Sequence, residues 1–300
     1  MRQVIAVQRY GSFAKAADAL GISQPALSRS IARLEDELGV QMFRRSASGA
    51  QITPAGELVA ERAASVIAET EALARDVALI AGGETGQVRV GASYVLRHGF
   101  VQDLMLRIAE RHPNLRLHAE VNDRASLISR LKSRQLDIVF TGALQDPALA
   151  VTRVATFEII VIAAPGHPLA GRRDVPREEF SAHRNVGPPA ALMYGLFGLV
   201  ETDALSFHTT NDYDTIIAFV KAGIATAVVP AFLAHPMIQS GELVQVDVKP
   251  RAYLDFVAAT TQAAAGAPML QKLIGYAMSW GETLRAPDVP PRPAANSGRG

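Results

Sequence analysis

Apolar segments of strand length alternate with amphipathic helical segments from residue 87 to about residue 285, and this alternation restricts the fold more than any other feature. Strands that alternate with helices of about 10–15 residues indicate βαβ units and a parallel sheet. The pattern restarts after residues 163–168, so we predict two α/β lobes with a cleft between them. The helix that follows the first strand is expected to bury Val101, Leu104, Met105 and Ile108. The expected strands are 87–93, 115–121, 136–140, 207–210 and 225–229.

A single long helix is expected before this region, beginning after Thr53 and Pro54 and extending to about residue 81. Apolar residues recur along it at intervals of seven, which is typical of a coiled coil. The pattern therefore predicts dimerisation through this helix, while packing of the helix on its own chain is the alternative. The glycine-rich segment 82–86 that follows is predicted to be a hinge. The residues expected to form the seam are Val59, Ala63, Val66, Leu73, Val77 and Ile80.

Two short helical segments near the N-terminus form the strongest local pattern in the chain. Residues 13–20 have one apolar face that includes the small Ala16 and Ala17, and a glycine-containing turn follows at 21–23. Ser23 is suited to cap a second helix, in which Pro25 occupies an early position that needs no backbone N–H. Two short helices joined by a tight glycine turn predict a helix-turn-helix. The second helix is expected to bury Leu27, Ile31, Leu34 and Leu38.

Residues 39–53 predict a wing, in which two strands flank a Ser- and Gly-rich tip at 46–50. Gln and Arg side chains form bidentate hydrogen bonds with adenine and guanine, and small apolar groups contact the thymine methyl. Seven basic and four acidic residues give residues 1–56 a charge of +3, whereas the whole chain carries +1. The alternative is a helix pair whose outer face is merely solvated. The residues expected to contact DNA are Ser12, Ser23, Gln24, Pro25, Ala26, Ser28, Arg29, Arg33, Arg44, Arg45 and Thr53.

The sequence GSFAKAADALGISQPALSRSIARLEDELGVQMFRR at 11–45, followed by ITPAG at 52–56, resembles the N-terminal domain of the LysR-type transcriptional regulators. The similarity continues more loosely to about residue 285 through LDIVFTG, PGHPLA and VKAGIATAVVP. It implies that the winged domain binds DNA, that the linker helix dimerises, and that two lobes like those of periplasmic binding proteins hold a small effector. One departure from the family pattern is the first helix, which is several residues shorter than in the family. The true start codon is therefore expected to lie upstream.

Polar residues follow the predicted strands at the positions where a two-lobed α/β protein binds its ligand. Such ligands lie beyond the carboxyl ends of strands, where helix N-termini present free N–H groups. For each residue taken alone, a helix-capping role is the alternative. Arg97, His98 and Arg124 would suit an anionic effector such as a carboxylate, although roles on the solvated surface fit them equally well. The residues expected to bind effector are Ser93, Asn122, Arg124, Thr141, Gly142, Pro188 and Asn211.

Composition and the lack of certain motifs exclude other classes of function. The chain has no cysteine, so disulfides, thiolate metal sites and cysteine nucleophiles are excluded. Its seven histidines lack the spacing of metal ligands, and no GxxxxGK[ST], GxGxxG or GxSxG motif is present. No metal and no cofactor are therefore expected. The early apolar run is broken by Gln8 and Arg9, and no apolar stretch has the length of a membrane span, which favours a cytoplasmic protein without membrane contact.

These observations predict an effector-responsive DNA-binding transcriptional regulator without catalytic activity, built from α/β lobes, a linker helix and a winged helix-turn-helix. The predicted parts are the DNA-binding domain at 1–56, the linker and hinge at 57–86, the effector domain at 87–285 and a disordered proline-rich tail at 286–300. Double-stranded DNA, further copies of the chain in a dimer or tetramer, and a small effector are the expected partners, and RNA polymerase is a further candidate. The alternatives are a solute-binding protein or enzyme with an accessory winged domain, and an architectural DNA-binding protein.

Overall fold

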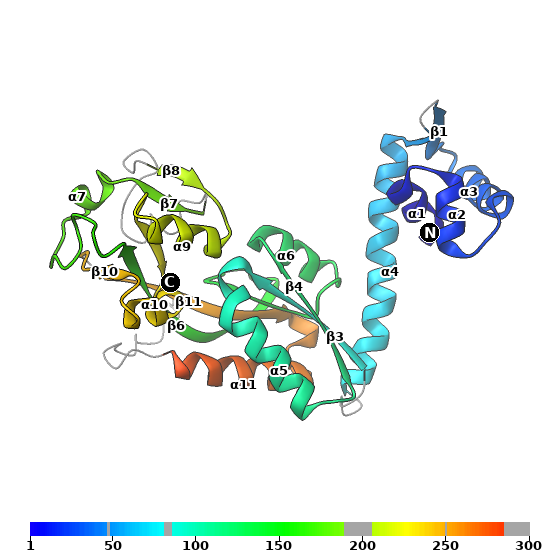
Figure 1. Cartoon of the computed structure of the whole chain (residues 1–300). Helices are drawn as coiled ribbons and strands as arrows, with labels where there is room; N and C mark the ends of the chain where they lie inside the picture. Colours follow the sequence, from blue (N-terminus) through cyan, green and yellow to red (C-terminus); the bar gives the residue numbers. More distant parts are fainter. Residues whose placement is uncertain (47–48, 81–85, 189–205, 250, 285–300) are drawn as a thin grey trace, which may run out of the picture.

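The computed structural model describes residues 1–46, 49–80, 86–188, 206–249 and 251–284. A small helical domain lies beside one end of the long helix α4 (Pro54–Ile80), and a two-lobed α/β domain lies beyond the other end (Figure 1). Three features predicted from the sequence lie outside the described residues: the tip of the wing at 47–48, most of the glycine hinge at 82–85, and the tail at 286–300.

The N-terminal domain contains a helix-turn-helix followed by a β-hairpin, as predicted. Its elements are α1 (Arg2–Tyr10), α2 (Phe13–Leu20), α3 (Gln24–Leu38), β1 (Phe43–Ser46) and β2 (Gly49–Ile52). Gly21 ends α2 with a φ of 66°, a left-handed conformation that glycine adopts without steric cost. Val7, Ala17, Leu27 and Met42 form part of the shared core. The prediction that Leu38 is buried is wrong: its side chain is 49% exposed because α3 extends past that core.

The start of α4 is fixed against the hairpin by a close backbone approach at Gly56. Thr53 caps the helix, because its hydroxyl oxygen accepts a hydrogen bond from the N–H of Gly56 at 3.1 Å. A Cβ atom at Gly56 would overlap the carbonyl oxygen of Met42 and would lie 2.8 Å from Cγ1 of Ile52. Only glycine therefore fits at this position without displacing the hairpin.

We expect Gly56→Ala to lower the free energy of unfolding by about 2 kcal/mol, because overpacking against the backbone forces it to shift. The matched control is Gly275→Ala, where an added Cβ meets no atom within 4 Å among the described residues. That control should be neutral or stabilising by up to about 1 kcal/mol, since alanine favours a helix interior. Urea unfolding followed by circular dichroism measures both, and equal stability of the two variants would contradict the steric argument.

The described side chains of the predicted seam divide between two environments along α4, and the side chain of Ile80 lies outside what the structure describes. Ala63 is buried, and Val59 packs against the core of the N-terminal domain, where α4 lies along α1. Val66, Leu73 and Val77 are instead 51%, 64% and 59% exposed. The first part of the pattern thus serves packing within the chain, and the later part presents apolar side chains to solvent.

The α/β domain is built on one sheet with the strand order β10-β6-β11-β5-β3-β4, and β9 also pairs with β6. The strands β4 and β5 run parallel to β3, but β11 is antiparallel to β5 and to β6, and β6 is antiparallel to β9 and β10. The prediction of a parallel sheet is therefore wrong for the sheet as a whole, which is mixed. The strands are β3 (Gly86–Ser93), β4 (Leu115–Asn122), β5 (Ile138–Gly142), β6 (Leu149–Ala163), β9 (Ala227–Pro230), β10 (Val244–Val246) and β11 (Ala252–Thr261).

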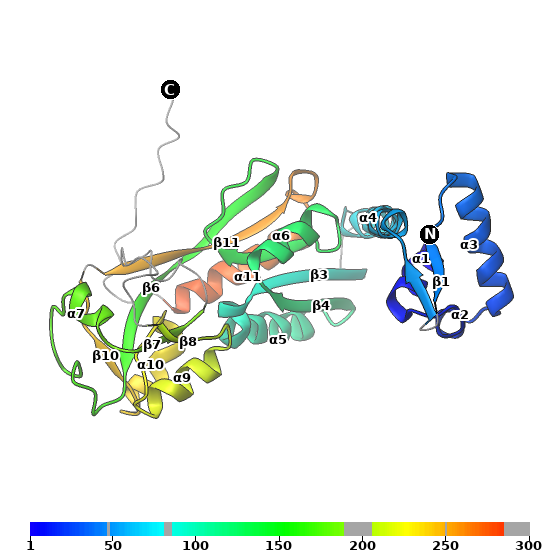
Figure 2. The same ribbon diagram turned by 90° about the horizontal axis from the view of Figure 1, so that it is seen from above.

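The long strands β6 and β11 run side by side from one lobe to the other (Figures 1 and 2). In the first lobe α5 (Gln102–Arg111) and α11 (Pro268–Thr283) pack on one face of the sheet, and α6 (Arg124–Lys132) packs on the other. Leu104 and Ile108 of α5 are buried as predicted, but Met105 is 44% exposed because it lies beyond the buried face. The second lobe adds α7 (Arg177–Ser181), α9 (Tyr213–Lys221), α10 (Ala231–Gln239) and the parallel pair of β7 (Asn185–Gly187) and β8 (Ser206–Thr209).

Candidate functional site

The helix α3 presents a polar face at its N-terminal end. The hydroxyl of Ser23 accepts a hydrogen bond from the N–H of Ala26 at 3.4 Å, which caps the helix as the sequence indicates. Gln24, Pro25 and Arg29 are exposed, whereas Ser28 is half-buried. The first turns of α3 thus offer an amide, a hydroxyl and a guanidinium, which are the groups that form hydrogen bonds with base edges in the major groove.

An open groove separates α3 from the hairpin formed by β1 and β2. Gln24 and Ser28 line one side of this groove, and Phe43 and Arg44 line the other. Glu35 fixes the two sides together, because its Oε1 accepts hydrogen bonds from the backbone N–H groups of Met42, at 2.6 Å, and Phe43, at 3.1 Å. The fold therefore brings Arg44 of the hairpin to the same side of the domain as the polar face of α3.

Four other residues that were predicted to contact DNA lie outside the lining of this groove. Ser12 caps α2 by accepting a hydrogen bond from the N–H of Lys15, and Arg33 forms an ion pair with Glu37 at 2.9 Å. Thr53 is buried, and its hydroxyl donates to the carbonyl oxygen of Gln41 at 2.6 Å while it caps α4. The structure assigns Thr53 to the junction of hairpin and helix rather than to a surface that reaches DNA. Arg45 lies in β1, and its side chain lies outside what the structure describes.

A second hollow lies between the two lobes of the α/β domain. Its lining from the first lobe follows β3, and its lining from the second lobe comes from the turn before α9 and the first residue of that helix. This is the arrangement expected of a ligand site in a two-lobed α/β protein, beyond the ends of strands. The lining residues are Tyr94, Arg97, His98, Thr210, Asn211, Asp212 and Tyr213.

Basic and acidic side chains face each other across this interlobe hollow. The Nε2 atom of His98 lies 3.4 Å from Oδ2 of Asp214 on the other lobe. The pKa of Asp212 is lowered, chiefly because the hydroxyl and the N–H of Thr215 donate to its carboxylate, and Arg97 lowers it further. Burial raises the pKa of Tyr213 to about 12.

The predicted effector residues are only partly brought together at this hollow. Asn211 lines it, and Asn122 is linked to it through a hydrogen bond of 3.5 Å donated by the hydroxyl of Tyr94. The Oγ atom of Ser93 is buried and has no hydrogen-bond partner in the described part of the chain. Such an unpaired hydroxyl is uncommon and indicates a place for a ligand or water. Arg124 does not line the hollow, and its guanidinium donates a hydrogen bond to the carbonyl oxygen of Ala143 at 3.0 Å.

Asn211 is the one predicted effector residue that lines the described hollow, and three of the other six lie in or beside strands. Thr141 is almost fully buried in β5, where it pairs with Val257 of β11. Gly142 is the last residue of β5 and approaches Leu254, and Pro188 follows β7. Residues 212–214 were not among the predicted effector residues. The sequence DYDT at 212–215 follows a strand and indicates a capped helix N-terminus, so it could have directed attention to this segment.

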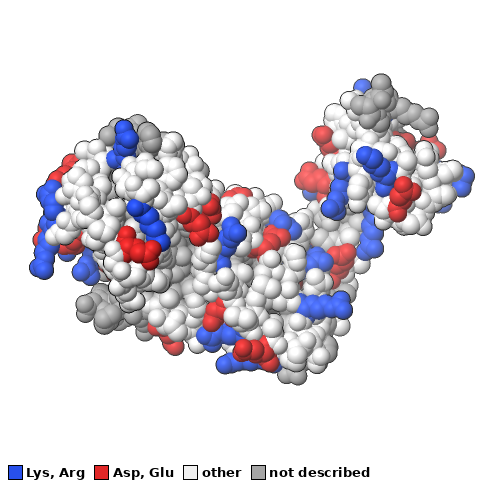
Figure 3. Space-filling view, in the orientation of Figure 1, with Lys and Arg blue, Asp and Glu red and all other residues white. Residues whose placement is uncertain are grey.

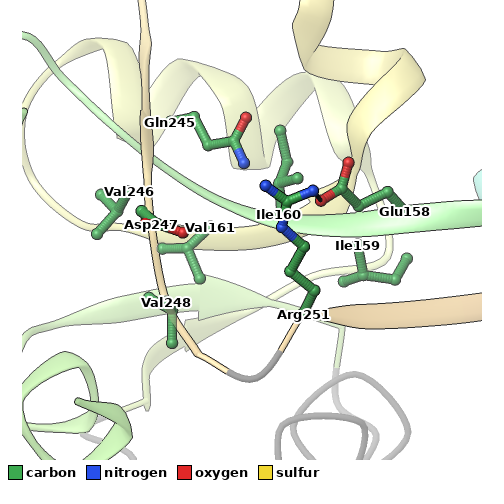
Figure 4. A pocket seen from close by; sticks show the side chains of 9 residues that line it. All are labelled: Glu158, Ile159, Ile160, Val161, Gln245, Val246, Asp247, Val248 and Arg251. Carbon is green, nitrogen blue, oxygen red and sulfur yellow. Dashed lines mark ion pairs between the residues drawn. The ribbon is translucent and has the colours of Figure 1, made fainter. Parts of the chain in front are cut away.

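A further hollow lies in the second lobe between β6 and β10 (Figure 4). Arg251 and Glu158 point toward each other across it, at 3.8 Å, and this pairing raises the pKa of Arg251 above its ordinary value. Lys249 nearby is paired with Asp174 and Asp247. The cations at this hollow therefore already have carboxylate partners, which does not favour an anionic ligand here.

Basic and acidic side chains are interspersed over the face of the molecule seen in Figure 3. Among the described residues, no cluster of three or more His, Asp or Glu side chains forms a candidate metal site. Within the same part of the chain, no helix is long and apolar enough to cross a membrane. The candidate sites are therefore the groove beside α3 and the interlobe hollow.

Residues 1–57 match the family described as bacterial regulatory helix-turn-helix protein, lysR family, and residues 81–281 match the LysR substrate binding domain. An SDS degradation transcriptional activation protein from a Pseudomonas strain is 28% identical over 83% of this chain and 84% of its own length. The regulator BudR of Raoultella terrigena is 30% identical over 77% of this chain and 83% of its own length. The crystal structure of full-length CbnR in complex with its target DNA has a similar fold, with a TM-score of 0.70 at 17% identity, over 93% of this chain and 98% of that one.

Proposed function

Because the chain belongs to the LysR family of bacterial helix-turn-helix regulators, we propose a specific role for each of its two candidate sites. The protein is a DNA-binding transcriptional regulator with an effector-binding domain, and not an enzyme. We propose that the groove beside α3 reads DNA and that the interlobe hollow holds a small effector. We further propose that the protein acts in the cytoplasm, where its DNA target lies, and that RNA polymerase is a partner.

The exposed N-terminal face of α3 is the observation that carries the DNA-reading role. Gln24 and Arg29 suit direct hydrogen bonds with adenine and guanine in the major groove. Pro25 and Ala26 suit contact with a thymine methyl, and Ser28 suits a base or a phosphate. Arg44 and Arg45 on the hairpin then contact phosphates, which adds affinity without sequence preference. Ser12 and Ser23 contribute by capping α2 and α3.

Selection of binding sites from a random DNA library tests this role. We expect enrichment of one sequence made of two related half-sites, separated by about one helical turn of 10 base pairs or a multiple of it. Binding to DNA without any enriched sequence would favour an architectural role instead. Binding of a small molecule without any DNA binding would favour a solute-binding protein.

The apolar side chains on α4 support assembly of the regulator from copies of the chain. Val66, Leu73 and Val77 recur at intervals of seven and four residues and are more than half exposed in the single chain. Exposed apolar residues at this spacing suit pairing with a second helix of the same kind. Val59 and Ala63 support the seam indirectly, by packing α4 on its own N-terminal domain. We propose a homo-oligomer held together by this seam, with a dimer and a tetramer as the two candidate assemblies.

We propose that the effector bridges the two lobes and carries charge of both signs. Arg97 provides positive charge on one wall of the hollow and Asp212 provides negative charge on the other, while His98 contacts Asp214 of the second lobe. A purely anionic effector matches only the first wall. An effector that favours one arrangement of the lobes shifts the population toward that arrangement, and its coupling to DNA affinity is reciprocal.

We expect Asn211→Ala and Arg97→Gln to reduce the thermal stabilisation that small molecules give to the protein. A ligand present at about 100 times its Kd stabilises the native state by about 2.7 kcal/mol, so loss of binding removes a measurable shift in melting temperature. The screen uses metabolite fractions from the host, and the control is Arg116→Gln on the exposed surface of β4. Equal stabilisation of all variants by an active fraction would place its ligand elsewhere.

A further inference from the structure

The carboxylate of Glu71 on α4 contacts the N-terminal domain and the effector domain at the same time. Its Oε1 lies 3.3 Å from Nη2 of Arg2 on α1, and its Oε2 lies 3.1 Å from Nη2 of Arg89 on β3. The Glu71 side chain is 38% exposed and that of Arg89 is 25% exposed. One side chain thus joins the N-terminal domain to the effector domain.

The Arg89 end of this ionic bridge is fixed in the first lobe. The N–H of Arg89 donates to Oδ2 of Asp137 at 2.7 Å, and its carbonyl oxygen accepts from the N–H of Asp137 at 2.9 Å. The strand β3 lies between β4 and β5, and it leads directly to Tyr94 in the interlobe hollow. A shift of β3 relative to α4 therefore changes the contact between Arg89 and Glu71.

The Arg2 end of the bridge leads to the helix that reads DNA. Gln3 is the next residue of α1, and its Oε1 accepts a hydrogen bond from the hydroxyl of Ser30 on α3 at 2.6 Å. Ser30 lies one residue beyond Arg29 in the sequence. The contacts thus run without a gap from β3 through Glu71 and α1 to α3.

We propose that Glu71 is a positioning residue that sets the orientation of the effector domain relative to the DNA-binding domain, by holding Arg2 and Arg89 on one carboxylate. A second contact supports this orientation, because Nε of Arg134 lies 3.6 Å from Oε2 of Glu69 on the same helix. Partly exposed ion pairs are individually weak. Their role here is to bias orientation, since a contribution of this size changes the balance between two arrangements severalfold.

The significance of this bridge for regulation rests on the proposed function, but the orientation itself can be measured without DNA or effector. The chain has no cysteine, so single cysteines introduced at Ala19 on α2 and Asn114 before β4 take spin labels without other changes. Labelled subunits are diluted into an excess of unlabelled protein, so that pulsed electron spin resonance reports the distance within one chain. A failure of DNA binding would then leave this test of the bridge unaffected.

We expect Glu71→Gln to broaden the distance distribution about twofold, because the orientation loses its electrostatic bias. The triple charge exchange Arg2→Glu, Glu71→Lys and Arg89→Glu should restore the narrow distribution. The control Glu61→Gln, on an exposed turn of the same helix, should leave it unchanged. Raising the salt concentration to about 1 M should broaden the wild-type distribution, since exposed ion pairs are screened.

Several results would overturn the proposal. An unchanged distribution in Glu71→Gln would show that the bridge does not set the orientation. Equal broadening in Glu61→Gln would assign the effect to the overall charge of α4. Broadening in Glu71→Gln that the triple exchange does not reverse, in a protein with an unaltered melting temperature, would show that the paired charges are not the cause.

Discussion

Replacement of both Val66 and Leu73 by aspartate is expected to convert the assembled protein into folded monomers. Both side chains are more than half exposed in the single chain, at 51% and 64%, so the substitutions leave its own core intact. In a helix pair the same positions are buried, and carboxylates buried without partners cost several kcal/mol. Sedimentation velocity measures the assembly, and circular dichroism confirms that the monomer retains its helices.

A charge placed on an equally exposed leucine outside the seam provides the control. Leu106 on α5 is 64% exposed, the same as Leu73, so Leu106→Asp introduces the same change of charge at a comparable surface. That variant should keep the oligomeric state of the natural protein. An oligomer that persists in the folded Val66→Asp, Leu73→Asp variant would show that assembly depends on another surface.

The two outcomes along α4 show why a repeat in the sequence is an incomplete guide to contacts. Intervals of seven identify one side of a helix, but they do not identify what covers that side. Residues 59 and 63 belong to the same repeat as Val66, yet Ala63 is buried because α1 packs against the first turns of α4. That contact depends on the tertiary fold of residues 1–56, which the repeat does not contain.

The failure to predict the antiparallel strands of the sheet also arises from contacts between distant parts of the chain. The strand β5 was predicted from a near-continuous apolar run, and such a run is the same whether its neighbour is parallel or antiparallel. Its partner β11 lies more than 100 residues further along the chain and pairs Val257 with Thr141. Pairing at such a distance is decided by the whole topology, so the elements were predictable and their direction was not.

The two candidate sites also differ in how far apart their residues lie in the sequence. Residues 12–45 form the proposed DNA-reading surface from one continuous segment, in which caps, turn and apolar faces are all local signals. The interlobe hollow combines residues near 94–98 with residues near 210–214, and no local pattern relates the two. Strand ends therefore identified Asn211 and the neighbourhood of Tyr94, whereas Asp214 was found only through its contact with His98.

Removal of polar groups from the first turns of α3 is expected to reduce sequence-specific binding strongly and to leave nonspecific binding almost unchanged. Gln24→Ala and Arg29→Ala each remove the hydrogen bonds that we propose one side chain forms with a base edge. Each substitution should therefore cost about 1–3 kcal/mol in binding free energy, which is about fivefold to 150-fold in Kd. Both side chains are exposed and neither caps a helix, so the melting temperature should stay close to that of the natural protein.

Arg44→Ala on the hairpin provides the contrast, because a phosphate contact contributes equally to every sequence. This variant should weaken binding to target and random DNA by the same factor, and it should reduce the slope of log Kd against log salt by about 1. Competition titrations with target and random DNA at several salt concentrations separate the two behaviours. If Gln24→Ala and Arg29→Ala weakened both kinds of DNA equally, the polar face of α3 would act on phosphates, and sequence would have to be read by another part of the domain.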